Sequence, residues 1–292
     1  MKVFVFDLLA YGEQLEHLKI GNELPYPLPK KYFKPEVAGR TYAEHLEAWE
    51  ELDHLGYDGV GFNEHHCSPY GLMNSPNLLA AAAAQRTKRL KLLIYGNLLP
   101  LHEPLRLAEE LAMLDCMSNG RLISGFARGI PREYQVHNVP LAQSRARFEE
   151  AFDIITRAWT EEVFSYRGEF WSYEDVAMWP RPLQQPHPPI WMPVVGSKES
   201  IGFAARHGQP ITWIARRHHP LWQLHRDRTA APDRLFDRCL DRLCEPGEPP
   251  RRPIRSRGFS GPDHRRCRAV GRLAGAQGRN RSARGRGPSL TR

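Results

Sequence analysis

One carboxylate and two imidazoles stand together at Glu64-His65-His66, directly after the apolar stretch Gly59-Val60-Gly61-Phe62. Histidine titrates near neutral pH and can give or accept a proton, and a carboxylate can hold an imidazole in one tautomer. The apolar stretch is typical of a buried strand, and ligands of parallel α/β folds collect where strands end. The cluster is therefore the first candidate for a site that moves protons.

Other polar positions also follow predicted strands. Asn97 comes after the third strand, where its amide could contact a cofactor ring. Arg128 follows the fourth strand, and a guanidinium can bind phosphate through two parallel hydrogen bonds. Gly196, Ser197 and Ser200 lie where the fifth strand turns into a helix, so their N–H groups and hydroxyls could hold a phosphate. Each position also has an ordinary explanation as a strand-end polar group, a surface ion pair or a common turn.

A metal site at the two histidines is a weaker interpretation. Adjacent side chains of an extended chain point to opposite sides, so His65 and His66 should not meet one ion. The five cysteines show no paired metal-ligand spacing and give no disulfide framework. We therefore expect no bound metal.

Strands and helices alternate along most of the chain. Six strands are predicted at 3–7, 59–62, 90–95, 121–125, 190–195 and 210–214, with helices at 41–55, 76–86, 144–159 and 199–207 and another from Pro104 to Asn119-Gly120. The first helix is placed by a capping box at Thr41-Tyr42-Ala43-Glu44, after a long loop over 11–40. A small hairpin is expected at 164–171. Six strand–helix units indicate a parallel sheet of the (β/α)8 barrel type, which needs eight.

The pattern changes near Arg217. Residues 1–216 carry 8 Lys and 14 Arg against 26 acidic residues, whereas 217–292 carry no Lys, 19 Arg and 7 acidic residues. This Arg/Pro/Gly-rich tail lacks apolar periodicity and cannot bury enough surface to offset chain entropy. We predict an incomplete barrel body at 1–216 and a disordered or frame-shifted tail at 217–292. A natural polyanion-binding tail is the alternative, but evolved basic tails usually mix Lys with Arg.

The amino end begins directly with a strand rather than with the longer apolar segment of a signal peptide, and no apolar stretch approaches the roughly 20 residues of a membrane span. Together with the cysteine pattern, this favours a cytoplasmic protein without a membrane partner.

Several short motifs in a fixed order resemble the bacterial luciferase-like, flavin-dependent monooxygenases. Glu64-His65-His66 is followed by Tyr70-Gly71-Leu72, Asn74-Ser75-Pro76, Leu99-Pro100-Leu101-His102-Glu103-Pro104, Leu114-Asp115-Cys116-Met117-Ser118-Asn119-Gly120-Arg121, Phe126-Ala127-Arg128-Gly129 and Ser144-Arg145. The resemblance runs from Met1 to about Thr212.

The resemblance implies a TIM barrel that uses reduced FMN and O2 to oxygenate a small organic substrate such as an aldehyde. A separate flavin reductase would supply the reduced flavin, and a homodimer is expected. His65 matches the family's catalytic histidine and Glu64 its neighbour in the motif, so the resemblance implies these two as the catalytic residues. Arg128 matches a phosphate-contacting arginine, and Ser197 and Ser200 match other phosphate contacts. Gly196 stands where some luciferases carry an acidic residue, and Asn97 lies at a strand end near the flavin ring.

Four alternatives stay open at this point. A deazaflavin-dependent oxidoreductase shares the fold and a similar site. A metal-dependent TIM-barrel hydrolase would need ligands that the fifth and sixth strands do not supply. A nucleic-acid-binding module would rest on the basic tail, and we do not expect it. An inactive fragment would follow if the missing strands prevent closure of the barrel.

Overall fold

Seven parallel strands form the main sheet of the computed structural model, which describes residues 2–13, 15–20, 24–194 and 197–213. All of these residues belong to one compact unit, Met1–Glu245. The strands are β1 (Phe4–Asp7), β2 (Gly59–Phe62), β3 (Lys91–Ile94), β4 (Asn97–Leu98), β5 (Leu122–Ala127), β8 (Ile190–Val194) and β9 (Ile211–Trp213). The six predicted strands are confirmed, and β4 is an addition that the sequence did not reveal.

The strand order is β1-β2-β3-β5-β8-β9, and β4 pairs with the end of β5. Each new strand is added on the same side of the previous one, so the order never reverses as it does in a doubly wound sheet. A parallel sheet built in one direction carries its connecting helices on one face. The predicted α/β fold of the (β/α)8 TIM-barrel type is confirmed. The described residues contain the six predicted strands and the helices that follow the first five of them.

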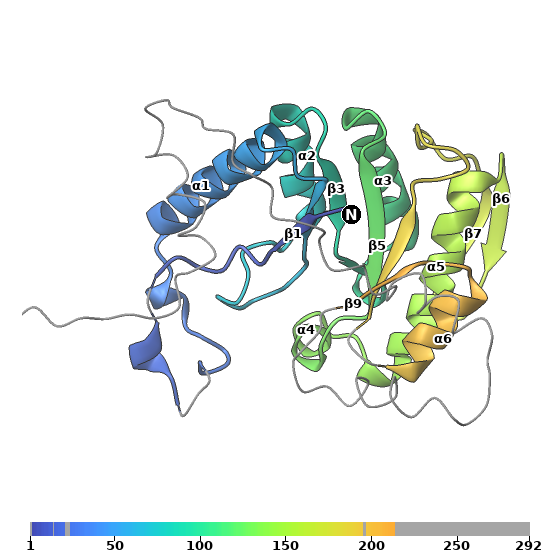
Figure 1. The fold of residues 1–292 in the computed structure, drawn as a ribbon. Coiled ribbons are helices and arrows are strands. Elements are labelled where there is room, and N and C mark those ends of the chain that lie inside the picture. Colours follow the sequence, from blue (N-terminus) through green and yellow to red (C-terminus); the bar gives the residue numbers. More distant parts are fainter. Residues whose placement is uncertain (1, 14, 21–23, 195–196, 214–292) are drawn as a thin grey trace, which may run out of the picture. The chain divides into compact units, whose positions relative to one another are not determined.

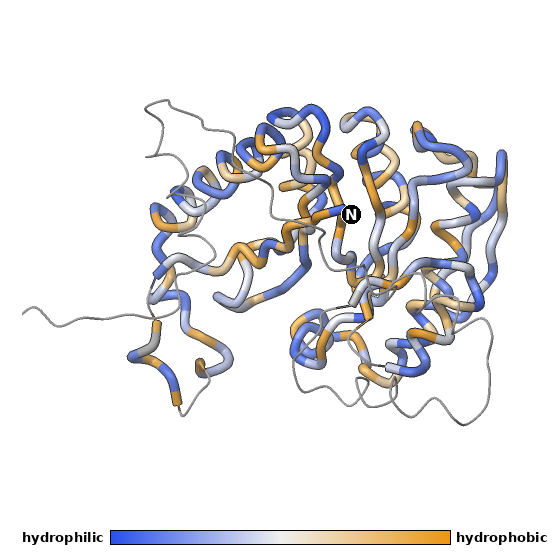
Figure 2. Tube along the Cα trace, viewed as in Figure 1, coloured by the Kyte–Doolittle hydropathy of each residue, from blue (hydrophilic) through white to orange (hydrophobic). Residues whose placement is uncertain are grey.

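The helices follow the strands in regular alternation (Figure 1). They are α1 (Pro35–His54), α2 (Pro76–Arg86), α3 (Pro104–Met117), α4 (Pro131–Val136), α5 (Ser144–Thr160) and α6 (Lys198–Arg206), with short 3-10 turns η1 (Glu16–Leu18), η2 (Lys30–Tyr32), η3 (Leu99–Leu101) and η4 (Leu141–Gln143). Helix α1 packs against α2, α2 against α3, and α3 against α5. Hydrophobic and hydrophilic residues alternate along α1, as expected for a helix with one face on the sheet (Figure 2).

The core lies between the sheet and these helices. All four residues of β2 are buried, as are Leu92 and Ile94 of β3. A strand of a parallel sheet is covered on both faces, which explains the apolar sequence of β2. Gly59 leaves room for the ring of Phe4, because a Cβ at Gly59 would lie 2.3 Å from that ring.

Helix α1 begins six residues earlier than its predicted start, so the expected capping box is wrong. Lys34 is the N-cap and Pro35 takes the first helical position, where its fixed φ suits a helix. Thr41 lies inside the helix and donates its hydroxyl to the carbonyl of Val37, at 2.9 Å. The loop predicted over 11–40 is correspondingly shorter and contains η1 and η2.

The remaining elements lie at the edges of this arrangement. A hairpin is present where one was predicted, as the antiparallel pair β6 (Phe164–Arg167) and β7 (Ser172–Val176). Its second strand lies beyond the predicted end at residue 171. The tail predicted over 217–292 lies outside the described residues, and so does its boundary at 216. Within the part of the chain that the structure describes, no helix is long and apolar enough to cross a membrane.

Candidate functional site

The carboxyl ends of neighbouring strands bring the predicted polar residues to one edge of the sheet. Phe62 at the end of β2 lies beside Ile94 at the end of β3. Asn97 lies beside Phe126 near the end of β5, and Arg128 follows β5 directly. Because these strands are parallel and adjacent, the side chains that follow them share one end of the sheet. Glu64, Asn97 and Arg128 therefore belong to one region.

Glu64 lies at the centre of a hydrogen-bonded cluster, and its side chain is fully buried. Its Oε1 lies 2.8 Å from Nε2 of His66 and 2.8 Å from Nε2 of His102. Its Oε2 accepts from Nδ2 of Asn97, at 3.2 Å, and from the backbone N–H of Leu98, at 3.1 Å. An ionised carboxylate can only accept hydrogen bonds, so both imidazoles donate through Nε2.

The charge of this cluster follows from these contacts. Burial alone would raise the pKa of Glu64, but the hydrogen bonds from His102 and His66 lower it to about 2. Burial likewise opposes charge on His102, yet its hydrogen bond to Glu64 raises the pKa of the imidazole. The stable arrangement is a carboxylate beside an imidazolium. Since Glu64 already receives four donors, it has little capacity left to act as a general base.

His65 has a different partner from the one its sequence neighbour suggested. Its Nδ1 lies 3.0 Å from Oε1 of Glu133, a residue of α4 that is 2% exposed. The expectation that Glu64 and His65 form the functional pair is therefore not what the contacts show. The His65 side chain is 22% exposed, and Tyr70 lies edge-on to its ring at 4.8 Å.

The two adjacent histidines diverge, as expected for neighbours on an extended chain. His65 contacts Glu133, whereas His66 contacts Glu64 and lies 4.5 Å from the ring of His137. Each imidazole is thus held by its own carboxylate. Among the described residues, no group of three or more His, Cys, Asp or Glu side chains is arranged to hold a metal ion.

Sequence reasoning missed two residues of this region. His102 was noted only as part of the motif at 99–104, and its contact with Glu64 was not predicted. Glu103, the next residue, caps α3 by accepting from the N–H groups of Leu105 and Arg106. Glu133 lies in α4, a short helix that is not among the predicted elements. A signal was present, since a proline followed two residues later by Glu is typical of a capped helix start.

Asn97 presents an unpaired acceptor at this edge. The residue is 1% exposed, and its Nδ2 donates to Glu64. Its Oδ1 is buried and has no hydrogen-bond partner among the described residues. An unsatisfied buried acceptor is costly, and a ligand donor would satisfy it. The Glu64 carboxylate can only accept, so it fixes the Asn97 amide with Nδ2 toward itself and leaves Oδ1 for a ligand.

The start of α6 supplies a hydroxyl at the same end of the sheet, and two cations from other elements act on it. Ser197 caps α6 by accepting from the N–H of Ser200, at 3.3 Å, and it donates to Glu199, at 2.6 Å. This hydrogen bond from Ser197 is the main cause that lowers the pKa of Glu199, and the positive charges of Arg145 and Arg128 add to it. Both guanidinium groups therefore lie within electrostatic reach of the helix start. Gly196 lies outside the described residues.

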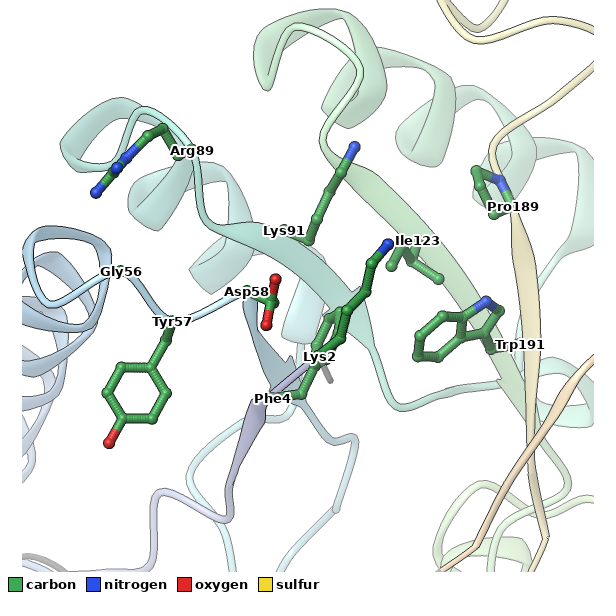
Figure 3. Close-up of a pocket in the computed structure, with 10 residues that line it drawn as sticks. All are labelled: Lys2, Phe4, Gly56, Tyr57, Asp58, Arg89, Lys91, Ile123, Pro189 and Trp191. Atoms are coloured by element: carbon green, nitrogen blue, oxygen red, sulfur yellow. The ribbon is translucent and has the colours of Figure 1, made fainter. Parts of the chain in front are cut away.

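A cavity of about 470 Å³ lies at the opposite, amino end of the strands (Figure 3). Its lining residues are Lys2, Phe4, Gly56, Tyr57, Asp58, Arg89, Lys91, Ile123, Pro189 and Trp191. Several of its charged groups already bind backbone: Arg89 donates to the carbonyl of Asp53, Lys91 to that of Gly120, and Asp58 accepts from the N–H of Val3. These contacts join strands and loops, so this end is structural in character.

Known proteins that are similar to this chain include two relatives found by sequence and one solved structure. The oxygenase component of a flavin-dependent trigonelline monooxygenase from Acinetobacter baylyi is 33% identical over 172 residues, covering 58% of this chain and 47% of the relative. An alkanal monooxygenase alpha chain from Photorhabdus luminescens is 32% identical over 200 residues, covering 68% and 54%. The crystal structure of the monooxygenase RslO1 from Streptomyces bottropensis matches with a TM-score of 0.66 and 31% identity, covering 83% and 66%.

The chain spans about half of the length of the curated relatives it matches. The sequence pattern of the luciferase-like monooxygenases matches residues 27–228, which is most of the chain and includes every predicted site residue. The chain therefore belongs to the luciferase-like monooxygenase family.

Proposed function

We propose that this chain is the oxygenase of a flavin-dependent monooxygenase that uses reduced FMN and O2 to oxygenate a small organic substrate such as an aldehyde. One observation carries the proposal. A partly exposed imidazole, an unpaired buried amide oxygen and a cationic helix start share the carboxyl end of one parallel sheet. The three features belong to His65, Asn97 and the Ser197 region with Arg128.

The cationic helix start suits the phosphate of FMN. A helix N-terminus offers unpaired N–H groups and a partial positive charge, and arginine adds a bidentate donor. Arg128, Ser197 and Ser200 would hold the phosphate. Gly196, which precedes Ser197 in the sequence, stays a predicted contact outside the described residues. Glu199 stands at the same helix start, and a phosphate there would compete with it for Ser197 and for the two arginines.

Asn97 suits the edge of the flavin ring. Its Oδ1 would accept a hydrogen bond from a ring N–H, which removes the cost of the buried unpaired oxygen. In this proposal Glu64 orients Asn97, because it accepts a hydrogen bond from Nδ2 of Asn97. We therefore propose that Glu64 is a positioning residue and not the catalytic residue that the sequence predicted.

His65 would move the proton in the reaction. Its Nδ1 is engaged with Glu133, so Nε2 is the ring atom that would take a proton from a ligand or return one. Reduced flavin, when bound, supplies the two electrons with which one oxygen atom of O2 becomes water while the other enters the substrate.

A separate flavin reductase is part of the proposal. The Acinetobacter baylyi relative is an oxygenase component, which supports a two-component arrangement for this chain as well. We also propose a homodimer, to be tested by the mass of the full chain in solution.

Flavin binding tests the proposal without any assay of turnover. Anaerobic titration of the full chain with reduced FMN should show saturable binding. Arg128→Ala should weaken it about 10- to 100-fold, because a charge-assisted hydrogen bond contributes about 1.5–3 kcal/mol. Arg167→Ala, on the exposed face of β6, is the matched control and should leave the Kd unchanged.

Two outcomes would count against FMN. Failure of the wild-type chain to bind reduced FMN would overturn the proposed cofactor, and tighter binding of a deazaflavin in a parallel titration would favour the alternative cofactor. An unchanged Kd in Arg128→Ala would remove Arg128 from the phosphate site.

A further inference from the structure

We propose that Glu133 is the positioning residue of His65: it fixes the proton of the imidazole on Nδ1 and thereby keeps Nε2 as the acceptor. The consequence for catalysis rests on the proposed function. The tautomer itself does not, since it follows from contacts within the described residues.

Both oxygens of Glu133 are committed. Oε1 lies 3.0 Å from Nδ1 of His65, and Oε2 accepts from the N–H of Ile130, at 2.8 Å. The side chain is 2% exposed, so water does not compete for these contacts. A carboxylate that already accepts from Ile130 and faces an imidazole nitrogen can be satisfied only if that nitrogen carries a hydrogen.

Residues 129–133 hold the carboxylate of Glu133 in place. Pro131 starts α4, and Glu133 at the third helical position reaches back to the N–H of Ile130, which precedes the helix. Gly129 adopts φ +83°, and a Cβ at this position would lie 2.8 Å from Oε2 of Glu133. A glycine is therefore needed both for the backbone turn and for the close approach of the carboxylate.

His65 is held from its other sides as well. Its N–H donates to the carbonyl of Met73, at 3.3 Å, and its carbonyl accepts from Nδ2 of Asn74, at 2.8 Å. Tyr70 lies edge-on to the ring. With the backbone and one ring face held, the contact at Nδ1 decides which ring nitrogen carries the proton.

The contact joins residues 68 positions apart, so it ties the loop after β2 to the segment after β5. Glu64 performs the corresponding task for His66 through Nε2, which leaves the opposite ring nitrogen of His66 free of that contact. The two adjacent imidazoles are thus set in opposite tautomers by two buried carboxylates. This difference singles out His65 as the histidine with an Nε2 acceptor.

The test is the tautomer of His65, read from its ring ¹⁵N shifts by NMR on the full chain, with the signal assigned by its loss in His65→Gln. Wild-type protein should show Nδ1–H. In Glu133→Gln, the amide oxygen should stay with the N–H of Ile130, so the NH2 group faces Nδ1 and favours the opposite tautomer, Nε2–H. Glu174→Gln makes the same chemical change on the exposed side of β7 and should leave the tautomer unaltered.

Glu133→Asp is the conservative variant, and it also serves if Glu133→Gln fails to fold. Aspartate can only accept, so His65 should keep Nδ1–H although the shorter side chain loosens the contact. Turnover should fall about 10- to 100-fold in Glu133→Gln and less in Glu133→Asp. This loss is smaller than the roughly 10²- to 10⁴-fold that general acid–base catalysis typically contributes, because His65 itself is still present. The Kd for reduced FMN should not change in either variant.

The proposal would be overturned if His65 carried its proton on Nε2 in the wild-type protein, or kept it on Nδ1 in Glu133→Gln. A proton lost from Nδ1 of His65 in Glu133→Asp would also overturn it. If the tautomer switches as expected while wild-type protein shows no oxygenation, the proposed function fails and the positioning role stands.

Discussion

A buried carboxylate lies near each end of the sheet, and the two differ in the groups that donate to them. Asp53, near the amino ends of the strands, accepts from the backbone N–H groups of Lys88, Arg89 and Leu90 at 2.7–3.0 Å. Glu64, at the carboxyl ends, accepts from two imidazoles, one side-chain amide and one backbone N–H.

This difference separates a structural carboxylate from one in a chemical site. Backbone N–H groups do not titrate and have no second function, so Asp53 simply joins α1 to the start of β3. Imidazoles titrate, and the amide of Asn97 keeps an unpaired oxygen. Burial and a lowered pKa are common to both carboxylates and therefore do not identify the site. The site is identified by the kind of group that donates hydrogen bonds to the carboxylate.

The largest expected effect is on catalysis at the carboxyl end. His65→Ala should lower oxygenation of a probe aldehyde about 10²- to 10⁴-fold, because the group that moves the proton is gone. The Kd for reduced FMN should change little. The melting temperature should fall, because Oε1 of the buried Glu133 loses its partner. Stopped-flow turnover with chemically reduced FMN measures the effect.

His54→Ala is the control for this experiment, because its side chain is 67% exposed near the end of α1. It should turn over at the wild-type rate. Normal turnover in His65→Ala would show that His65 takes no part in the reaction. The carboxyl end of the sheet would then no longer differ from the amino end as a chemical site.

The next effect is on stability at the amino end. Asp53→Ala leaves three N–H groups without their acceptor, one of them on Leu90, which is fully buried. The free energy of unfolding should fall by about 3 kcal/mol, since an unsatisfied buried donor costs about 1–3 kcal/mol. Urea unfolding measures this, with Asp153→Ala on the exposed side of α5 as control.

Flavin binding by Asp53→Ala should match that of wild-type protein at temperatures where the variant is folded. A large loss of FMN affinity without a loss of stability would contradict the assignment of this end to structure.

The elements of the fold could be predicted because their signals are local. Alternation of apolar stretches and capped helices located six strands, and Ser75-Pro76 marked the start of α2, where the Ser75 hydroxyl accepts from the N–H of Leu78. The start of α1 was missed because Thr41 and Glu44 have the spacing of a capping box inside a longer helix. Spacing alone does not exclude such a coincidence.

The partners within the site could not be predicted in the same way. Glu64 and His65 are adjacent in the sequence, but the side chains of neighbours on an extended chain diverge. The partner of His65 in the folded chain is Glu133. His102 reaches Glu64 across 38 positions. Strand ends show which residues share an edge of the sheet, whereas the pairing among them depends on the path of the loops.

The smallest expected effect concerns how stability depends on pH. The folded pKa of Glu64 is about 2, below its ordinary value of 4.5, so its contribution is present above pH 4.5 and is lost as the pH falls toward 2. The folded pKa of His102 is raised above 6.5, with Glu110 adding to the attraction of Glu64. Its contribution is therefore complete below pH 6.5 and is lost as the pH rises through the folded pKa.

The Glu64–His102 pair should thus stabilise the fold most between pH 4.5 and 6.5. His102→Gln keeps a neutral donor of similar reach, and it should cost about 1 kcal/mol in that window, the typical difference between a charged and a neutral hydrogen bond. The cost should shrink at alkaline pH. The free energy of unfolding lost in Asp53→Asn should stay constant above pH 5, because the backbone N–H groups that donate to Asp53 do not titrate. Urea unfolding of both variants from pH 5 to 9 measures the two profiles, and parallel profiles would show that the imidazolium of His102 adds nothing to the Glu64 cluster.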